Sequence, residues 1–237
     1  MLAALDVFSD VGCHAIGFHR AGIRTAAFCE INQFRRARLA QHFPGIPIHD
    51  DIHTFDGVPA RIGIGGPPCQ QTSVASAIHG KRSGESLWSE YLRVGLNVGL
   101  EWFVVEQPPG HAAWETEVAD DLSRHGYHCA RVEFAASDVG APYPRRRVFI
   151  LACTSLPRLE VAWGSVPRQV EYVARAADAR GDWNPDQLAA LRVDARSAGE
   201  MDRAASRVRT ERIEALGDSN PPHMAEVIGR AIVAAYT

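Results

Sequence analysis

One cysteine lies in a loop suited to nucleophilic chemistry. Cys69 follows two glycines and two prolines in the run Gly65-Gly66-Pro67-Pro68-Cys69-Gln70. The glycines let the backbone approach a ligand closely, and the prolines stiffen the loop that presents the thiol. We therefore predict that Cys69 is a nucleophile, provided that a neighbour or ligand favours its thiolate. Cys29, Cys129 and Cys153 fit better as buried, inert cysteines.

A carboxylate and three consecutive arginines complete the candidate catalytic set. Glu106 closes an apolar run, 102–106, that predicts a buried strand, and a carboxyl group there can donate or accept a proton. The run Arg145-Arg146-Arg147 stands directly before a second apolar run and offers fixed positive charge to a base or a phosphate. A structural salt bridge is the alternative for Arg145 or Arg147, but three arginines in succession favour a functional role.

Short apolar runs that alternate with helical patterns must position these side chains. The pattern predicts an α/β fold with a mostly parallel sheet, whose chemistry lies at the carboxyl ends of the strands. We expect strands at 3–8, 25–30, 61–65 and 102–106, helices at 15–21, 33–43, 91–99 and 114–125, and a closing pair of strands at 127–133 and 147–153.

The periodic pattern ends after Cys153, which suggests three parts. Residues 1–153 are predicted to form the catalytic domain. Residues 154–212, with their prolines, tryptophans and arginines, are predicted to form a small insert. Residues 213–237 carry a last motif and an amphipathic helix, which we expect to pack back on the catalytic domain.

Composition narrows the class of protein. The chain has 237 residues, 46% of them hydrophobic and 22% charged, which is typical of a globular protein. Its five cysteines include no C-x-x-C pair, so we expect no metal site and no disulfide framework. No leader and no membrane-spanning run is evident, which favours a soluble cytoplasmic protein, a monomer by default. The net charge of -3 means that any nucleic-acid contact depends on local arginines.

Seven short motifs in collinear order resemble those of the DNA (cytosine-5)-methyltransferases. The loop that contains Cys69 resembles the catalytic loop of that family. The other motifs are Leu5-Asp6-Val7-Phe8-Ser9-Asp10-Val11-Gly12, Cys29-Glu30, Asp51-Ile52, Glu106-Gln107-Pro108, Tyr143-Pro144-Arg145-Arg146-Arg147 and Gly217-Asp218-Ser219-Asn220-Pro221-Pro222. The resemblance implies a Rossmann-like methyltransferase fold in which residues 154–212 recognise the target sequence.

The resemblance also implies a mechanism. Cys69 adds to carbon 6 of a flipped-out cytosine, which makes carbon 5 nucleophilic enough to take a methyl group. Glu106 holds N3 and the amino group of the base, and Arg147 and Arg145 supply positive charge. The implied cofactor is S-adenosylmethionine, with S-adenosylhomocysteine as product and no metal. Its binding residues are expected to be Phe8, Gly12, Glu30, Asp51, Ile52, Pro68 and Asp218.

The implied partner is double-stranded DNA, in a bacterial host or a phage-infected cell. Several motif positions differ from the family: Asp10 replaces a glycine, Gln107-Pro108 replaces Asn-Val, Tyr143 replaces a glutamine and Asp218 an asparagine. Two alternatives stay open, the first because it shares the fold and the nucleophile, and the second because of these altered motifs. One is a tRNA cytosine-5 methyltransferase, and the other is a catalytically silent homologue that binds DNA.

Overall fold

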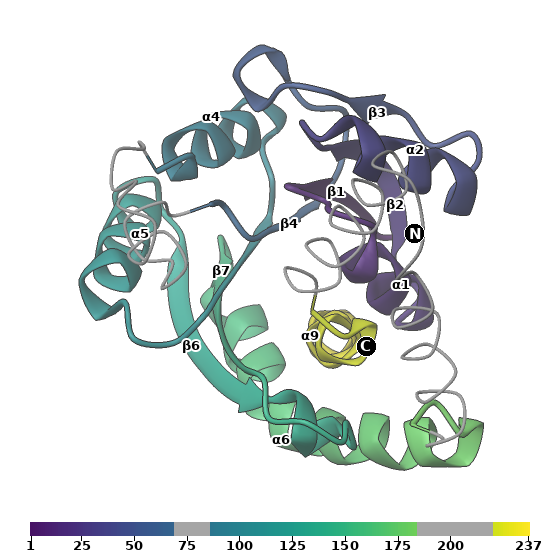
Figure 1. Cartoon of the computed structure of the whole chain (residues 1–237). Coiled ribbons are helices and arrows are strands. Elements are labelled where there is room, and N and C mark those ends of the chain that lie inside the picture. Colours follow the sequence, from purple (N-terminus) through teal and green to yellow (C-terminus); the bar gives the residue numbers. More distant parts are fainter. Residues whose placement is uncertain (69–85, 184–219) are drawn as a thin grey trace.

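The computed structural model describes residues 1–68, 86–183 and 220–237. Within these ranges a seven-stranded sheet runs in the order β3-β2-β1-β4-β5-β7-β6 (Figure 1). Its strands are β1 (Ala3–Val7), β2 (Arg24–Cys29), β3 (Ile48–His49), β4 (Ile62–Gly65), β5 (Trp102–Gln107), β6 (His128–Ala135) and β7 (Arg146–Cys153). Neighbouring strands among the first five are parallel, whereas β7 is antiparallel to both β5 and β6. The predicted mostly parallel sheet with a closing pair of strands is confirmed.

Helices cover both faces of the sheet (Figure 1). They are α1 (Cys13–Arg20), α2 (Gln33–His42), α4 (Trp88–Val98), α5 (Ala112–Arg124), α6 (Leu156–Arg180) and α9 (Pro222–Ala234), with short 3-10 helices η1 (Ile52–Thr54) and η2 (Ala136–Val139). Side chains alternate between the faces along each strand. In β5, Trp102 and Val104 join the core under α1, α6 and α9, and Phe103 and Val105 join the core under α4 and α5.

Helix α6 occupies much of the segment that we expected as an insert. It buries Leu159, Ala162, Val166 and Val173 in the same core as Met224 and the other apolar residues of α9. This part of the segment therefore packs with the sheet domain. The rest of the expected insert, from residue 184 on, lies outside the described residues, so its role in recognition stays a prediction.

Helix α9 lies against α1 and α6 (Figure 1). Its close approach to α1 depends on Gly17, because a Cβ there would collide with the carbonyl oxygen of Pro222 and lie 2.6 Å from the amide nitrogen of Glu226. Since α9 begins just after Asn220, this packing brings residues from the end of the chain to the carboxyl edge of β1. Among the helices described, none is long and apolar enough to cross a membrane.

Candidate active site

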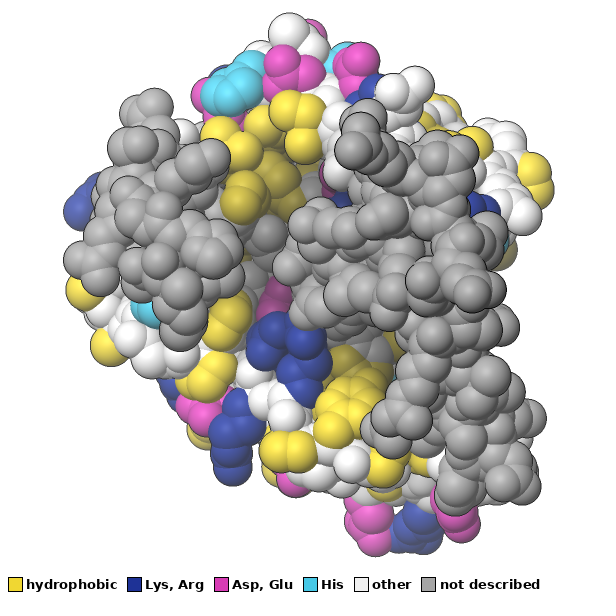
Figure 2. Space-filling view, in the orientation of Figure 1, with side chains coloured by type: hydrophobic (Ala, Val, Ile, Leu, Met, Phe, Trp, Pro, Cys, Tyr) yellow, Lys and Arg dark blue, Asp and Glu magenta, His cyan; other side chains and the backbone are white. Residues whose placement is uncertain are grey.

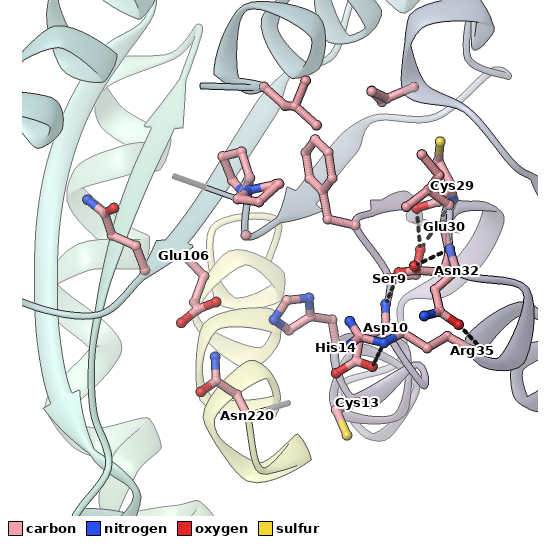
Figure 3. A pocket seen from close by; sticks show the side chains of 18 of the residues that line it. Ser9, Asp10, Cys13, His14, Cys29, Glu30, Asn32, Arg35, Glu106 and Asn220 are labelled. Carbon is pink, nitrogen blue, oxygen red and sulfur yellow. Dashed lines mark hydrogen bonds and ion pairs between the residues drawn. The ribbon is translucent and has the colours of Figure 1, made fainter. Parts of the chain in front are cut away.

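The carboxyl ends of β1, β2, β4 and β5 open into one cavity of about 890 Å³. Figure 2 shows this face hollowed, with basic side chains at the hollow, and Figure 3 shows the cavity from close by. Eight predicted site residues line it: Phe8, Glu30, Asp51, Ile52, Pro68, Glu106, Arg145 and Arg147. These eight residues therefore lie together at the carboxyl edge of the sheet, and the roles expected of them stay predictions.

Glu106 and Arg147 form an ion pair in the cavity wall. The Nε atom of Arg147 lies 2.7 Å from Oε1 of Glu106, and the two side chains are only 14% and 11% exposed. Burial lowers the pKa of the Arg147 guanidinium, although the Glu106 charge partly opposes this shift. The other carboxylate oxygen lies over Gly66, where a Cβ would stand 2.7 Å from it. The Glu106 carboxylate thus lies between the guanidinium of Arg147 and the backbone of Gly66.

Arg145 contacts Asn220, which lies just before α9. Its Nε atom donates to Oδ1 of Asn220 at 3.0 Å, and Asn220 is buried, with 4% of its surface exposed. Asn220 immediately precedes the turn into α9 and also lines the cavity. The packing of α9 on α1 therefore also positions an arginine of the site.

The loop between β1 and α1 follows an unusual backbone path. Phe8 and Asp10 have φ angles of 56° and 49°, in the left-handed region that side chains rarely adopt. Ser9 anchors the loop, because its hydroxyl donates to the Asp6 carbonyl and accepts from the amide of Cys29 at 3.2 Å. Residues held in such conformations cluster at ligand sites, where surrounding contacts maintain them.

Glu30 is held by two backbone amides. Its Oε2 accepts from the amide of Asp10 at 2.8 Å and its Oε1 accepts from the amide of Asn32 at 2.8 Å. Burial raises the pKa of this carboxyl group, and the two amide hydrogen bonds oppose the shift. A carboxylate oxygen can accept two hydrogen bonds, so each Glu30 oxygen can accept one more from a ligand. A fixed carboxylate of this kind, at the end of the second strand, suits the hydroxyls of a ribose.

Apolar side chains line the cavity next to Glu30. Ile52 is buried, whereas Ile31 is 76% exposed although it lines the same cavity. Phe8 lines it as well and contacts Tyr91 edge to face, with the ring centroids 6.5 Å apart. Asp51 caps η1, because its Oδ1 accepts from the amide of His53 at 2.9 Å. This end of the cavity offers flat apolar surface beside carboxylates, which suits a purine nucleoside.

Of the other three predicted site residues, only Gly12 is among the described residues. Gly12 is absent from the cavity lining, and with φ of 89° its missing side chain leaves room for the ring of Phe43. Cys69 and Asp218 lie outside the described residues. Pro68, directly before Cys69, is exposed in the cavity wall. Within the described ranges, no three His, Cys, Asp or Glu side chains gather as metal ligands would.

The cavity also contains residues that we did not predict. His14, Ile31, Arg35 and Asn220 all line it. Ile31 follows Glu30 directly, so its place after the second strand was an available signal. His14 and Arg35 lie in the first turns of helices, where the sequence pattern distinguishes no functional side chain. Asn220 belongs to the last motif, but its contact with Arg145 depends on the packing of α9.

Comparison with known proteins identifies the family. Residues 2–171 match the C-5 cytosine-specific DNA methylase family, and the chain belongs to it. Among curated relatives, the type II methyltransferase M2.BsuMI of Bacillus subtilis is 30% identical over 162 residues, which cover 64% of this chain and 42% of the relative. The type II methyltransferase M.DdeI of Desulfomicrobium norvegicum is 27% identical over 167 residues, which cover 64% of this chain and 40% of the relative. The chain thus spans about two fifths of the length of these relatives.

Solved structures support the fold. The Entamoeba histolytica methyltransferase EhMeth superimposes with a TM-score of 0.52 at 15% identity, covering 65% of this chain and 53% of that one. A mutant of Spodoptera frugiperda DNMT2 gives a TM-score of 0.54 at 18% identity, covering 66% of this chain and 51% of that one. At these identities the likeness concerns the fold, which is the α/β methyltransferase fold expected from the sequence.

Proposed function

We propose that the chain is a DNA cytosine-5 methyltransferase that transfers a methyl group from S-adenosylmethionine to carbon 5 of a flipped-out cytosine through a covalent adduct with Cys69. The observation that carries this proposal is the pairing of Glu106 with Arg147 at 2.7 Å, in the same cavity that holds Glu30 and Ile52. The Glu106 carboxylate, with its arginine, and the residues that would hold a nucleoside thus line one cavity, as methyl transfer between two bound molecules requires.

In the proposed reaction, the thiolate of Cys69 forms a bond to carbon 6 of the cytosine, and the electron pair of the C5–C6 double bond moves toward carbon 5. Glu106 donates a proton to N3 as negative charge develops there. Arg147 keeps the Glu106 carboxyl group in place and provides positive charge beside the base. After methyl transfer, carbon 5 loses its proton to a base and the Cys69 sulfur leaves, which restores the aromatic ring.

The cavity fits the cofactor that the family implies. S-adenosylmethionine supplies an electrophilic methyl group on sulfur. Glu30, already oriented by two amides, would accept from the ribose hydroxyls. Ile31 and Ile52 would cover the faces of the adenine, with Phe8 beside it and Asp51 near its amino group. Pro68 and Asp218 remain proposed contacts on the basis of the motifs alone.

Double-stranded DNA is the proposed substrate. The target base must leave the duplex to reach Glu106, which costs about a few kcal/mol of stacking. Arg145 and Arg147 supply positive charge in the cavity wall, and basic side chains gather on the same hollowed face (Figure 2). For recognition of the target sequence we propose the part of the 154–212 segment that follows α6.

The test is a covalent trap. A cytosine that carries fluorine at carbon 5 offers no removable proton after methyl transfer, so the bond to the thiol persists. Incubation with S-adenosylmethionine and duplex DNA that contains 5-fluorocytosine at the target should give a conjugate that survives denaturation. Cys69→Ser should abolish it, and Glu106→Gln should slow its formation severely, because the amide cannot donate a proton to N3.

The target sequence must be identified first, by base-resolution sequencing of cytosine modification in DNA from cells that express the chain. Methylation of natural DNA without a trapped conjugate would refute the role of Cys69. Methylation of tRNA but not of duplex DNA would favour the tRNA methyltransferase. Absence of S-adenosylmethionine binding by calorimetry would favour a silent DNA-binding homologue.

A further inference from the structure

His14 lies in the cavity wall and has no role in the proposed reaction. It occupies the first turn of α1, is 9% exposed, and lies between Glu106 and Asp10 in Figure 3. Its Nδ1 is 3.7 Å from Oδ1 of Asp6, which is 1% exposed and is not part of the cavity lining. The imidazole thus stands between a buried carboxylate behind it and the open cavity in front. Its second ring nitrogen has no hydrogen-bond partner among the described residues.

The arginines of the cavity wall are arranged differently. Arg147 pairs with Glu106, Arg145 with Asn220, and Arg35 with Asp10 at 3.2 Å, so each of them contacts another residue that lines the cavity. The partner of His14 lies behind the wall. The Asp6 carboxylate can stabilise a positive charge on the His14 ring through Nδ1. The other ring nitrogen then stays available to a ligand that enters the cavity.

The start of α1 adds a second attraction for an anion. The N-cap residue is Gly12, which has no side chain to cap the helix. The amide groups of a helix N-terminus favour negative charge. His14 therefore brings a cationic ring to a helix end that by itself attracts anions.

We infer that His14, supported by Asp6, binds the carboxylate of the methionine end of S-adenosylmethionine. The inference rests on the proposed function, because it concerns the cofactor of that reaction. With the nucleoside between Ile31 and Ile52 and the ribose at Glu30, the methionine end must lie along the loop between β1 and α1. That loop leads directly to His14.

The charged groups around His14 make this binding dependent on pH. Burial lowers the pKa of the imidazole, but the nearby carboxylate of Asp6, with the charges of Glu106 and Asp10, outweighs burial and raises that pKa. Arg147 faces Glu106 from β7. The charged groups of α9, Glu226 and His223, face Arg20 at the far end of α1. A raised pKa means that the positive charge is present at low pH and is lost as the pH rises through that pKa.

The test compares two ligands that differ only in the carboxylate, S-adenosylmethionine and decarboxylated S-adenosylmethionine, by titration calorimetry. The wild-type chain should bind S-adenosylmethionine about 10-fold or more tightly, the value of one charge-assisted hydrogen bond. In His14→Gln the preference should fall to about 3-fold or less. The wild-type preference should also decline between pH 6 and pH 9, whereas that of His14→Gln should stay level.

His19→Gln is the matched control, because His19 lies on the same helix, accepts from the amide of Thr25 and does not line the cavity. It should keep the wild-type preference. If the wild type binds both ligands with equal affinity, the inference is overturned and the proposed function is unaffected. This comparison uses the wild type alone, so it does not depend on whether a variant folds. A preference that persists in folded His14→Gln overturns it as well. Failure of the wild type to bind either ligand refutes the proposed cofactor itself.

Discussion

Gly66 lies beneath the carboxylate of Glu106, and its replacement by alanine tests how tightly that carboxylate must be held. A Cβ at this position would stand 2.7 Å from Oε2 of Glu106, whereas ordinary contact begins at 3.4 Å. The carboxylate would therefore have to move by about 0.7 Å. Because its other oxygen lies 2.7 Å from Nε of Arg147, the movement would also weaken that ion pair.

The expected effect is large on the rate and small on stability. A misplacement of about 1 Å costs up to about 100-fold in rate, so Gly66→Ala should slow methyl transfer by about 10- to 100-fold. The free energy of unfolding should fall by only about 1 kcal/mol, since the displaced atom is the end of a side chain that faces a cavity. Single-turnover transfer of a labelled methyl group measures the first effect, and urea denaturation measures the second.

Gly164→Ala is the matched control, because a Cβ at Gly164 meets nothing within 4 Å. It should keep the wild-type rate. If Gly66→Ala also keeps that rate while its fold is intact, the position of the Glu106 carboxylate does not limit the reaction, and the role proposed for Glu106 is wrong.

Three further changes test other parts of the structure. Gly17→Ala should destabilise the chain by about 1–3 kcal/mol in urea denaturation, because its Cβ would press on the backbone of α9, and an unchanged midpoint would contradict the packing of α1 on α9. Glu30→Ala should weaken S-adenosylmethionine binding in calorimetry by about 1.5–3 kcal/mol, and unchanged affinity would refute the ribose placement. Burial, with the nearby charges of Glu30, Asp51 and Asp50, raises the pKa of Cys29 to about 12. Iodoacetamide at pH 8.5 should therefore leave Cys29 unmodified in the native chain, because the thiolate is the reactive form. Peptide mass spectrometry checks this prediction.

The elements of the sheet could be predicted because their residues carry strong local patterns. β5 begins with four apolar residues and α4 has a clear apolar face, so strand and helix were both recognisable to within a few residues. Helix α6 was missed because prolines interrupt its pattern. Pro157 lies in its first turn, where no hydrogen bond is lost, but Pro167 lies inside it. Burial of Val166 and Val173 against the core offsets that loss, and this packing is not visible in the local sequence.

Some residues of the candidate site could likewise be located from local sequence patterns, and others could not. Glu30 and Glu106 could be located because each ends a strand, and parallel strands end at the same edge of a sheet. Arg35 and Asn220 could not, since their positions depend on how α2 and α9 approach that edge. His14 had no local signal either, because its importance comes from Asp6, a buried residue on a different element.

Asp10 shows why a changed motif can keep its backbone path. Its φ of 49° is in the region where glycine is favoured, and an aspartate there carries a cost of about 1 kcal/mol or more. Two contacts hold it in place, because its amide donates to Glu30 and its carboxylate pairs with Arg35. The aspartate therefore adopts a backbone conformation that glycine favours, and it adds a negative charge that acts on His14. The departure from the family pattern at Asp10 thus bears on the charge near the methionine end of the proposed cofactor.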